Sequence, residues 1–314
     1  RLKRLAKINN PDSVIPTAIE FVDIAGLVKG ASKGEGLGNK FLANIRECDA
    51  IAQVVRFFED SNITHVHGGI DPKRDREIID TELILADLQT LEKRLNKART
   101  EAKSNDKEKK HYQELLEKLN DHLSEGDLAS NLELEHEDKL LLTDLHLLTI
   151  KPHLYIVNLH EDQIKDFDKA KYKELLGVQD EEKIIPICAK VEEELADLGQ
   201  EDALIYLKEL GLEETGLNEI IRAAYKTLNL ITYLTAGPKE VRAWTVEDGA
   251  LAPEAAGVIH TDFQKGFIKA EVIKYTDYIS AGGENQAKEL GKMRIEGKDY
   301  EVKDGDIMHF RFNN

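Results

Sequence analysis

The sequence predicts an α/β fold: a parallel sheet flanked by helices, a long helical insertion, and a smaller region of short strands at the end. Three observations carry this prediction. Apolar runs rich in strand formers alternate with amphipathic helical patterns, which is typical of strand–helix–strand units. The stretch from Asp75 to Leu119 is charged and helical in pattern. From Ile231 onward, short strands alternate with turns.

Composition and charge exclude several classes of protein. The 314 residues are enough for two or three domains, and 41% hydrophobic with 33% charged residues is ordinary for a globular protein. No run approaches the roughly 18 apolar residues of a transmembrane helix, so we expect no membrane contact. The net charge of −17 argues against nonspecific coating of nucleic acid, although it permits a local basic patch.

The two cysteines, Cys48 and Cys188, lie far apart in sequence and lack CxxC spacing. Neither a disulfide framework nor a zinc site is therefore predicted, and a reducing cytoplasm is the expected compartment. For Cys188 we favour a buried small residue over a redox role.

The first predicted strand leads into a candidate phosphate site. Residues 1–14 are expected to form a short helix and loop before a buried strand at Thr17–Asp23. An aspartate at the end of a parallel strand can hold magnesium through water, and a following glycine lets a backbone N–H approach a terminal phosphate. Asp23 and Gly26 are therefore candidates, although DxxG alone is equally compatible with an ordinary turn. The glycines that continue to Gly38 indicate a switch that orders around a γ-phosphate.

The next elements suggest a parallel sheet with a helical insertion. A helix over Leu37–Cys48 and a strand over Ala50–Phe58 complete a strand–helix–strand unit. An antiparallel helical hairpin follows, beginning with a long helix over Asp75–Arg99, and a third helix is expected over His136–Leu148. Basic residues outnumber acids between Lys93 and Lys118, which indicates either a solvated coiled-coil face or a contact with RNA or an acidic partner.

The sheet resumes at Lys151 with KPHLYIVNL, which runs into the tetrapeptide Asn158-Leu159-His160-Glu161. A further strand over Lys183–Cys188 leads into Ala189-Lys190. The final region contains the strand patterns TYLTAG, KEVRAWTV, GFIKAEVI and DIMHFRFN, with a helix at PEAAGVIHTDF.

Two long stretches and one short motif resemble a known family. DIAGLVKGASKGEGLGN, beginning at Asp23, resembles the third nucleotide-binding motif of the Obg-like P-loop NTPases, in particular the YchF subfamily. NLHE at Asn158–Glu161 resembles that subfamily's form of the NKxD motif, and the region from LITYLTAG to AEVI resembles its carboxyl-terminal TGS domain. The resemblance covers nearly the whole chain.

The resemblance implies a P-loop NTPase fold: a doubly wound parallel sheet with an inserted α-helical hairpin, or coiled coil, and a ubiquitin-like α+β TGS domain. The expected boundaries are a nucleotide-binding domain in two parts, over residues 1–80 and 150–230, a helical hairpin over 81–149, and the TGS domain over 231–314.

It also implies a set of site residues. Asp23 and Gly26 would face the phosphates, with Asp23 holding Mg²⁺. Leu27 stands where many relatives of these enzymes have a water-orienting glutamine, and leucine can neither donate nor accept a hydrogen bond. His65, in NITHVHG, matches the histidine proposed for catalysis in YchF-like proteins, and a neutral imidazole can orient or deprotonate water near pH 7.

The resemblance also implies that the base is recognised at the ends of two predicted strands, the one that begins at Lys151 and the one over Lys183–Cys188. In GTPases the aspartate of NKxD reads guanine, whereas the NxxE of YchF-like proteins accompanies a preference for ATP. Residues after the next strand resemble the fifth nucleotide motif, whose backbone amides touch the base. The candidate nucleotide-binding residues are Asn158, Leu159, Glu161, Cys188, Ala189 and Lys190, of which Asn158 would buttress the phosphate loop.

The implied function is a ribosome-associated regulatory ATPase, linked to translation or stress, that hydrolyses ATP with Mg²⁺ and uses GTP less well. We expect a cytoplasmic monomer whose partner is the ribosome or its RNA. One alternative is a GTPase of the Obg or DRG kind, and another is a ribosome-binding module with vestigial nucleotide turnover. The sequence contains no GxxxxGK[ST] loop, so we expect these 314 residues alone to hydrolyse no nucleotide at a useful rate.

Overall fold

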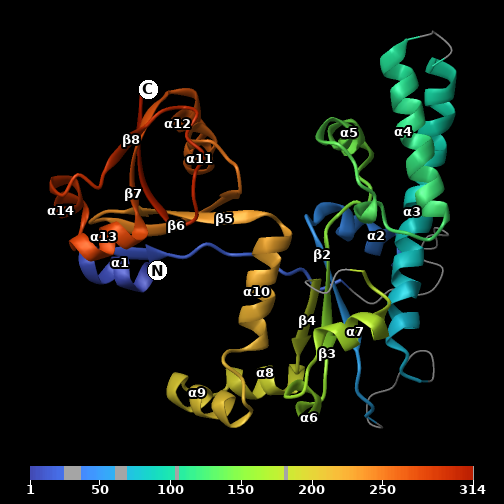
Figure 1. Ribbon diagram of the computed structural model, residues 1–314, viewed down its shortest axis with the longest axis horizontal. Coiled ribbons are helices and arrows are strands. Elements are labelled where there is room, and N and C mark those ends of the chain that lie inside the picture. The colour runs from blue at the N-terminus through green and yellow to red at the C-terminus, as the bar shows by residue number, and fades with distance from the viewer. Residues whose placement is uncertain (25–36, 61–68, 103–105, 180–182, 314) are drawn as a thin grey trace. The chain divides into compact units, whose positions relative to one another are not determined.

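The computed structural model describes residues 1–24, 37–60, 69–102, 106–179 and 183–313. The chain divides into two compact units (Figure 1). Unit 1 joins Arg1–Glu20 to Leu228–Asn314, and unit 2 runs from Phe21 to Thr227. Within the described ranges, no helix is both long enough and apolar enough to cross a membrane.

Unit 1 is an α+β unit whose described residues form a six-stranded sheet in the order β1-β6-β5-β9-β7-β8. The strands are β1 (Ser13–Ile15), β5 (Leu230–Ala236), β6 (Glu240–Glu247), β7 (Phe267–Lys274), β8 (Arg294–Glu296) and β9 (Asp306–Phe312). The helices are α1 (Leu2–Asn9), α11 (Ala252–Ile259), α12 (Thr261–Lys265), α13 (Tyr275–Ala281) and α14 (Glu284–Glu289). The fully buried Tyr233 donates a hydrogen bond to the Ala255 carbonyl at 2.8 Å, which joins the sheet to α11. This architecture agrees with the predicted carboxyl-terminal α+β module.

The first residues of the chain belong to unit 1, which corrects the expectation that a nucleotide-binding domain spans residues 1–80. Leu5 of α1 is fully buried in the same core cluster as Leu234, and Val14 of β1 pairs in parallel with Val241 of β6. The periodicity of a short helix shows which side is apolar but not which sheet that side covers.

Unit 2 contains a parallel sheet of β2 (Ile51–Arg56), β3 (His153–Asn158) and β4 (Ile184–Ile187), with β3 in the centre. Its helices are α2 (Leu37–Glu47), α3 (Pro72–Glu101), α4 (Lys107–Ser124), α5 (His136–Leu142), α6 (Glu161–Ile164), α7 (Lys169–Leu176), α8 (Ala189–Ala196), α9 (Gln200–Glu209) and α10 (Gly216–Thr227). Side chains of β3 are buried on both faces of the sheet. Tyr155 and Val157 join a core with α7 and α8, whereas Ile156 packs with Ile220 of α10. Burial on both faces is what a doubly wound sheet requires.

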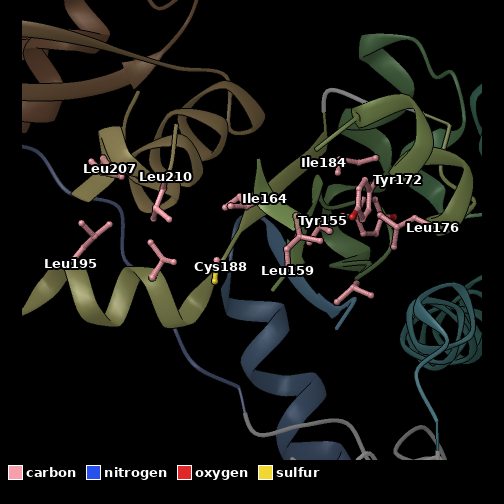
Figure 2. Close-up of a cluster of buried hydrophobic side chains, with 13 residues drawn as sticks. Tyr155, Leu159, Ile164, Tyr172, Leu176, Ile184, Cys188, Leu195, Leu207 and Leu210 are labelled. Carbon is pink, nitrogen blue, oxygen red and sulfur yellow. The ribbon is translucent and has the colours of Figure 1, made fainter. Parts of the chain in front are cut away.

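The larger of these cores reaches the ends of the strands (Figure 2). Leu159 follows β3 and Cys188 follows β4, and their side chains are only 1% and 3% exposed. Around them the core includes Ile164, Tyr172, Leu176, Leu195, Leu207 and Leu210. The segments after both strands are therefore anchored by buried side chains.

α3 and α4 lie side by side as the predicted helical pair (Figure 1). α3 begins where the Asp71 carboxylate accepts a hydrogen bond from the Arg74 amide at 3.0 Å, and α4 begins in the same way at Asp106. Their shared core is rich in leucine: Leu91, Leu95, Leu115, Leu116, Leu119 and Leu123.

A buried carboxylate ties α3 to the turn that precedes β3. Asp87 is 1% exposed and accepts hydrogen bonds from the Leu148 amide at 2.9 Å and the Thr149 amide at 2.7 Å. The Thr149 hydroxyl donates a third at 2.6 Å. Burial nevertheless raises the pKa of Asp87, because these hydrogen bonds only partly offset the loss of hydration.

Two predicted elements differ in the structure. Thr17–Asp23 has no strand partner among the described residues, and Phe21 and Val22 are 49% and 53% exposed rather than buried. An apolar run becomes a strand only when a neighbouring strand takes up its backbone hydrogen bonds. The helix predicted over His136–Leu148 ends earlier, since a 3₁₀ turn follows α5 and His146 adopts a left-handed φ of 47°.

Candidate nucleotide-binding site

The carboxyl ends of β3 and β4 bring together the two predicted base-contacting segments. Asn158 and Ile187 are register partners at the ends of their strands. Beyond them, the Leu159 amide donates to the Ile187 carbonyl at 2.8 Å, and the Ala189 amide donates to Asn158 Oδ1 at 3.2 Å. The Asn158 side chain therefore links the two loops directly.

The burial of each residue after β3 and β4 decides whether a nucleotide could contact its side chain or only its backbone. Leu159 and Cys188 point into the core shown in Figure 2, so only their backbone atoms face the strand ends. Ala189 and Lys190 are exposed, and the Lys190 ammonium lies 3.9 Å from the Glu194 carboxylate. The burial of Cys188 agrees with a packing role.

The loop that carries Glu161 is fixed by a capping box. The His160 amide donates to Gln163 Oε1 at 2.8 Å, and His160 Nδ1 accepts from the Asp162 amide at 3.4 Å. Gln163 also donates to the Phe57 carbonyl after β2, at 3.4 Å. Glu161 is consequently the first residue of α6, with a half-buried side chain.

Tyr206 of α9 packs against the core that contains Leu159 and Cys188, and none of the sequence motifs points to it. Its hydroxyl donates to Glu194 Oε2 at 2.5 Å. This hydrogen bond, together with the nearby carboxylates of Glu194 and Glu161, raises the pKa of Tyr206 to about 12. The phenol donates to Glu194, and the Glu161 carboxylate contributes to its electrostatic surroundings. No spacing in the sequence connects α9 with α6, so no signal was available to find it.

The predicted phosphate and catalytic residues are only partly described. Asp23 is exposed and has no hydrogen bond or ion pair within the described part of the chain. Gly26, Leu27 and His65 lie outside the described residues. A carboxylate such as Asp23 suits Mg²⁺ held through water, and within the described ranges it belongs to no cluster of three or more His, Cys, Asp or Glu ligands.

One group of possible metal ligands occurs elsewhere, in the described part of unit 1. Glu271, Glu284 and His309 have ligand atoms within 4.8 Å of one another. Arg311 donates to Glu271 at 3.0 Å, and this hydrogen bond lowers the pKa of that carboxyl. Because Arg311 already compensates its charge, Glu271 is better explained as an ion-pair partner.

Family models match both units. A model for the carboxyl-terminal region of YchF GTPases, described as a protein of unknown function (DUF933), matches residues 230–313. A model described as a 50S ribosome-binding GTPase matches residues 4–118.

Individual relatives extend the match over the whole chain. The "Ribosome-binding ATPase YchF" of Haemophilus ducreyi is 54% identical over 313 residues, covering 100% of this chain and 86% of the relative. The protein of the same name from Bacillus subtilis is 50% identical over 317 residues, with the same coverage. The chain belongs to the YchF family. The solved structure of the Schizosaccharomyces pombe YchF GTPase superposes with a TM-score of 0.84 at 37% identity, covering 99% of this chain and 84% of that one. The YchF-like fold predicted from the sequence is thereby confirmed.

In this YchF chain, acidic neighbours compensate several basic residues of the helical pair. Arg94 donates to the Tyr112 hydroxyl at 2.8 Å and pairs with Asp144. Lys97 lies 3.8 Å from Glu101, and Arg99 lies 3.0 Å from Glu117. Lys93 and Lys109 are exposed, and within the described ranges neither forms an ion pair. The net positive surface is smaller than residue counting predicts.

Proposed function

We propose that this protein is a ribosome-binding, cytoplasmic ATPase in which the ends of β3 and β4 bind the nucleotide base. Relatives that are half identical over the full chain carry the name ribosome-binding ATPase, which supports both activities. The proposed chemistry is hydrolysis of ATP to ADP and phosphate.

The placement of Glu161 carries the proposal of ATP preference. A guanine-reading site presents an aspartate that accepts hydrogen bonds from two donors of the base. Here the corresponding residue is one methylene longer and begins α6 in a loop fixed by its capping box. Its carboxylate also shares its surroundings with the protonated Tyr206. A glutamate held in this way does not reproduce the geometry in which an aspartate accepts two hydrogen bonds from guanine.

The burial of Leu159 limits how this idea can be tested. Restoring both residues of the guanine-reading motif would place a lysine where the side chain is 1% exposed. A buried, unpaired ammonium destabilises the fold, so a loss of binding would be uninformative. The substitution Glu161→Asp alone avoids this problem.

The experiment uses the chain extended at its amino terminus by the phosphate loop of a YchF relative. Calorimetric titration is expected to show tighter binding of ATP than of GTP. Glu161→Asp should shift the ratio of the two dissociation constants toward GTP by about tenfold, or about 1.4 kcal/mol. Asp162→Asn is the matched control, because the neighbouring Asp162 side chain is 90% exposed, and it should leave the ratio unchanged. A tenfold preference of the unchanged protein for GTP would favour the Obg-like GTPase alternative.

For hydrolysis we propose His65 as the residue that positions water and Asp23 as the Mg²⁺ ligand, with Gly26 and Leu27 in the switch. Asp23 is exposed and therefore accessible to an ion. The bound ion would compensate charge on the phosphates. His65 can act as a neutral imidazole near pH 7.

For ribosome contact we propose unit 1 together with Lys93 and Lys109. Exposed lysines that form no ion pair in the described part of the chain can release their counterions when they bind RNA phosphates, whereas already paired residues such as Arg99 contribute less. We further propose that the protein acts as a monomer.

A further inference from the structure

Gln163 lies on α6, beside the predicted base site, and its side chain forms hydrogen bonds in two directions. Its Oε1 accepts from the His160 amide at 2.8 Å, and its Nε2 donates to the Phe57 carbonyl at 3.4 Å. The first bond stays within the loop that carries Glu161, whereas the second reaches the segment after β2, 106 residues away in sequence. One amide side chain thus joins the base loop to a neighbouring strand end.

The Phe57 carbonyl is a fixed point, because the rest of Phe57 is held against β3 and α7. Its amide donates to the Asn158 carbonyl at 2.9 Å. Its ring meets the ring of Tyr172 edge to face, with the two centroids 5.0 Å apart, and Tyr172 is only 6% exposed. The bond from Gln163 therefore holds the base loop to an immobilised part of the sheet edge.

The base loop is anchored by a buried side chain on each side of the capping box. Leu159 before the box and Ile164 after it are 1% and 8% exposed, and both belong to the core shown in Figure 2. Between these anchors, the two side-chain bonds of the capping box fix residues 160–163. The bond to Gln163 is the shorter, at 2.8 Å against 3.4 Å, so it contributes more to the placement of Glu161.

We propose that Gln163 is a positioning residue for the nucleotide base, an inference that rests on the proposed base site at the ends of β3 and β4. It fixes the backbone from which the Glu161 carboxylate extends, and it needs no contact with the nucleotide. Without its amide, the loop between Leu159 and Ile164 gains freedom, and Glu161 is no longer held where it discriminates between bases. Gln163 therefore acts on affinity and on the choice of base, and the chemical step does not depend on it.

The test uses the chain extended at its amino terminus by the phosphate loop of a YchF relative, titrated calorimetrically with ATP and with GTP. Gln163→Ala should raise the dissociation constant of the preferred nucleotide by about fivefold, and that of the other by less than about twofold. The preference should therefore narrow. The kcat at saturating ATP should change by less than about twofold, because the position of the base affects binding and not the chemical step.

Gln163→Glu separates the two hydrogen bonds. Glutamate keeps the acceptor for the His160 amide, and it is a usual residue at this position of a capping box, but it cannot donate to the Phe57 carbonyl. This variant should bind the preferred nucleotide within about twofold of the unchanged protein. Gln179→Ala is the matched control, because it makes the same deletion at an exposed glutamine of unit 2, and it should leave both affinities unchanged.

Unchanged affinity for both nucleotides in Gln163→Ala would overturn the proposal. An equal loss for ATP and GTP would also overturn it, since a residue that only stabilises the fold lowers both in proportion. So would a glutamate variant as weak as the alanine variant. Gln163→Met keeps the length of the side chain but neither hydrogen bond, and it decides the matter if urea titration shows that the alanine variant does not fold.

Failure of the proposed function gives a different result. If the unchanged protein preferred GTP, the proposed ATP preference would be wrong, yet Gln163→Ala should still weaken binding of the preferred nucleotide. If neither nucleotide bound to the unchanged protein, the base site itself would be refuted, and the role of Gln163 with it.

Discussion

Replacing Asp87 tests how the helical pair is joined to the sheet. Asp87→Ala removes the acceptor of the Leu148 and Thr149 amides and of the Thr149 hydroxyl, all in a place that is 1% exposed. Two orphaned backbone N–H groups cost about 1–3 kcal/mol each. The alanine variant also no longer buries a carboxylate, and this relief offsets part of the loss. We expect a net loss of about 3 kcal/mol in the free energy of unfolding.

Urea titration with two probes can localise this loss. Far-ultraviolet circular dichroism reports mainly on the helices of unit 2, whereas the single tryptophan, Trp244, reports on unit 1. Asp87→Ala should move the circular dichroism transition to lower urea and leave the tryptophan fluorescence transition in place. Asp87→Asn keeps one acceptor oxygen and should lose less, about 1–2 kcal/mol.

Asp121→Ala is the matched control, because Asp121 is an exposed acid on α4 and should change stability by no more than about 0.5 kcal/mol. If Asp87→Ala also stayed within that limit, the three hydrogen bonds would not be what holds α3 to the turn before β3. A shift confined to the Trp244 signal would contradict the assignment of Asp87 to unit 2.

Three further outcomes are expected. Folding raises the pKa of Asp80 from 3.8 to about 6, so the folded state binds more protons between these values, and the free energy of unfolding should fall by about 3 kcal/mol as pH rises from about 4 to about 6. Urea titrations should show no such dependence on pH in Asp80→Asn. An identical dependence in this variant would contradict its origin in Asp80. In the chain extended by a phosphate loop, His65→Ala should lower kcat by about 10²-fold in single-turnover assays and leave ATP affinity within about threefold, because it removes the residue that positions water. His67→Ala, two residues further on, should have little effect. Equal rates for the unchanged protein and His65→Ala would remove His65 from the mechanism. Charge reversal of Lys93 and Lys109 should weaken ribosome co-sedimentation and its dependence on salt, more than reversal of Lys97, which Glu101 already pairs; unchanged pelleting would identify this surface as a solvated face.

The strands and long helices could be predicted because their signals are local. The apolar runs of β2, β3 and β4 and the leucine spacing of α3 and α4 each lie within one element. Thr17–Asp23 also has an apolar run, but strand formation depends on a partner that local sequence does not specify. The assignment of α1 failed for the same reason, since its apolar side packs against a sheet more than 200 residues further along the chain.

The approach of the segments after β3 and β4 could be predicted because they follow neighbouring parallel strands, whereas contacts between side chains of distant elements could not be predicted. The Asn158 link to the Ala189 amide agrees with the expectation that the ends of parallel strands converge. Tyr206 and the pairing of Arg94 with Asp144 depend on contacts between separate helices.

The most direct test of the proposed function is phosphate release from ATP and GTP at equal concentrations. The chain extended by a phosphate loop would be measured with and without ribosomes, beside the 314-residue chain as a control. We expect faster hydrolysis of ATP than of GTP, ATP-dependent co-sedimentation with ribosomes, and no useful hydrolysis by the control. Faster release from GTP, or no hydrolysis of either nucleotide by the extended chain, would contradict a ribosome-binding ATPase.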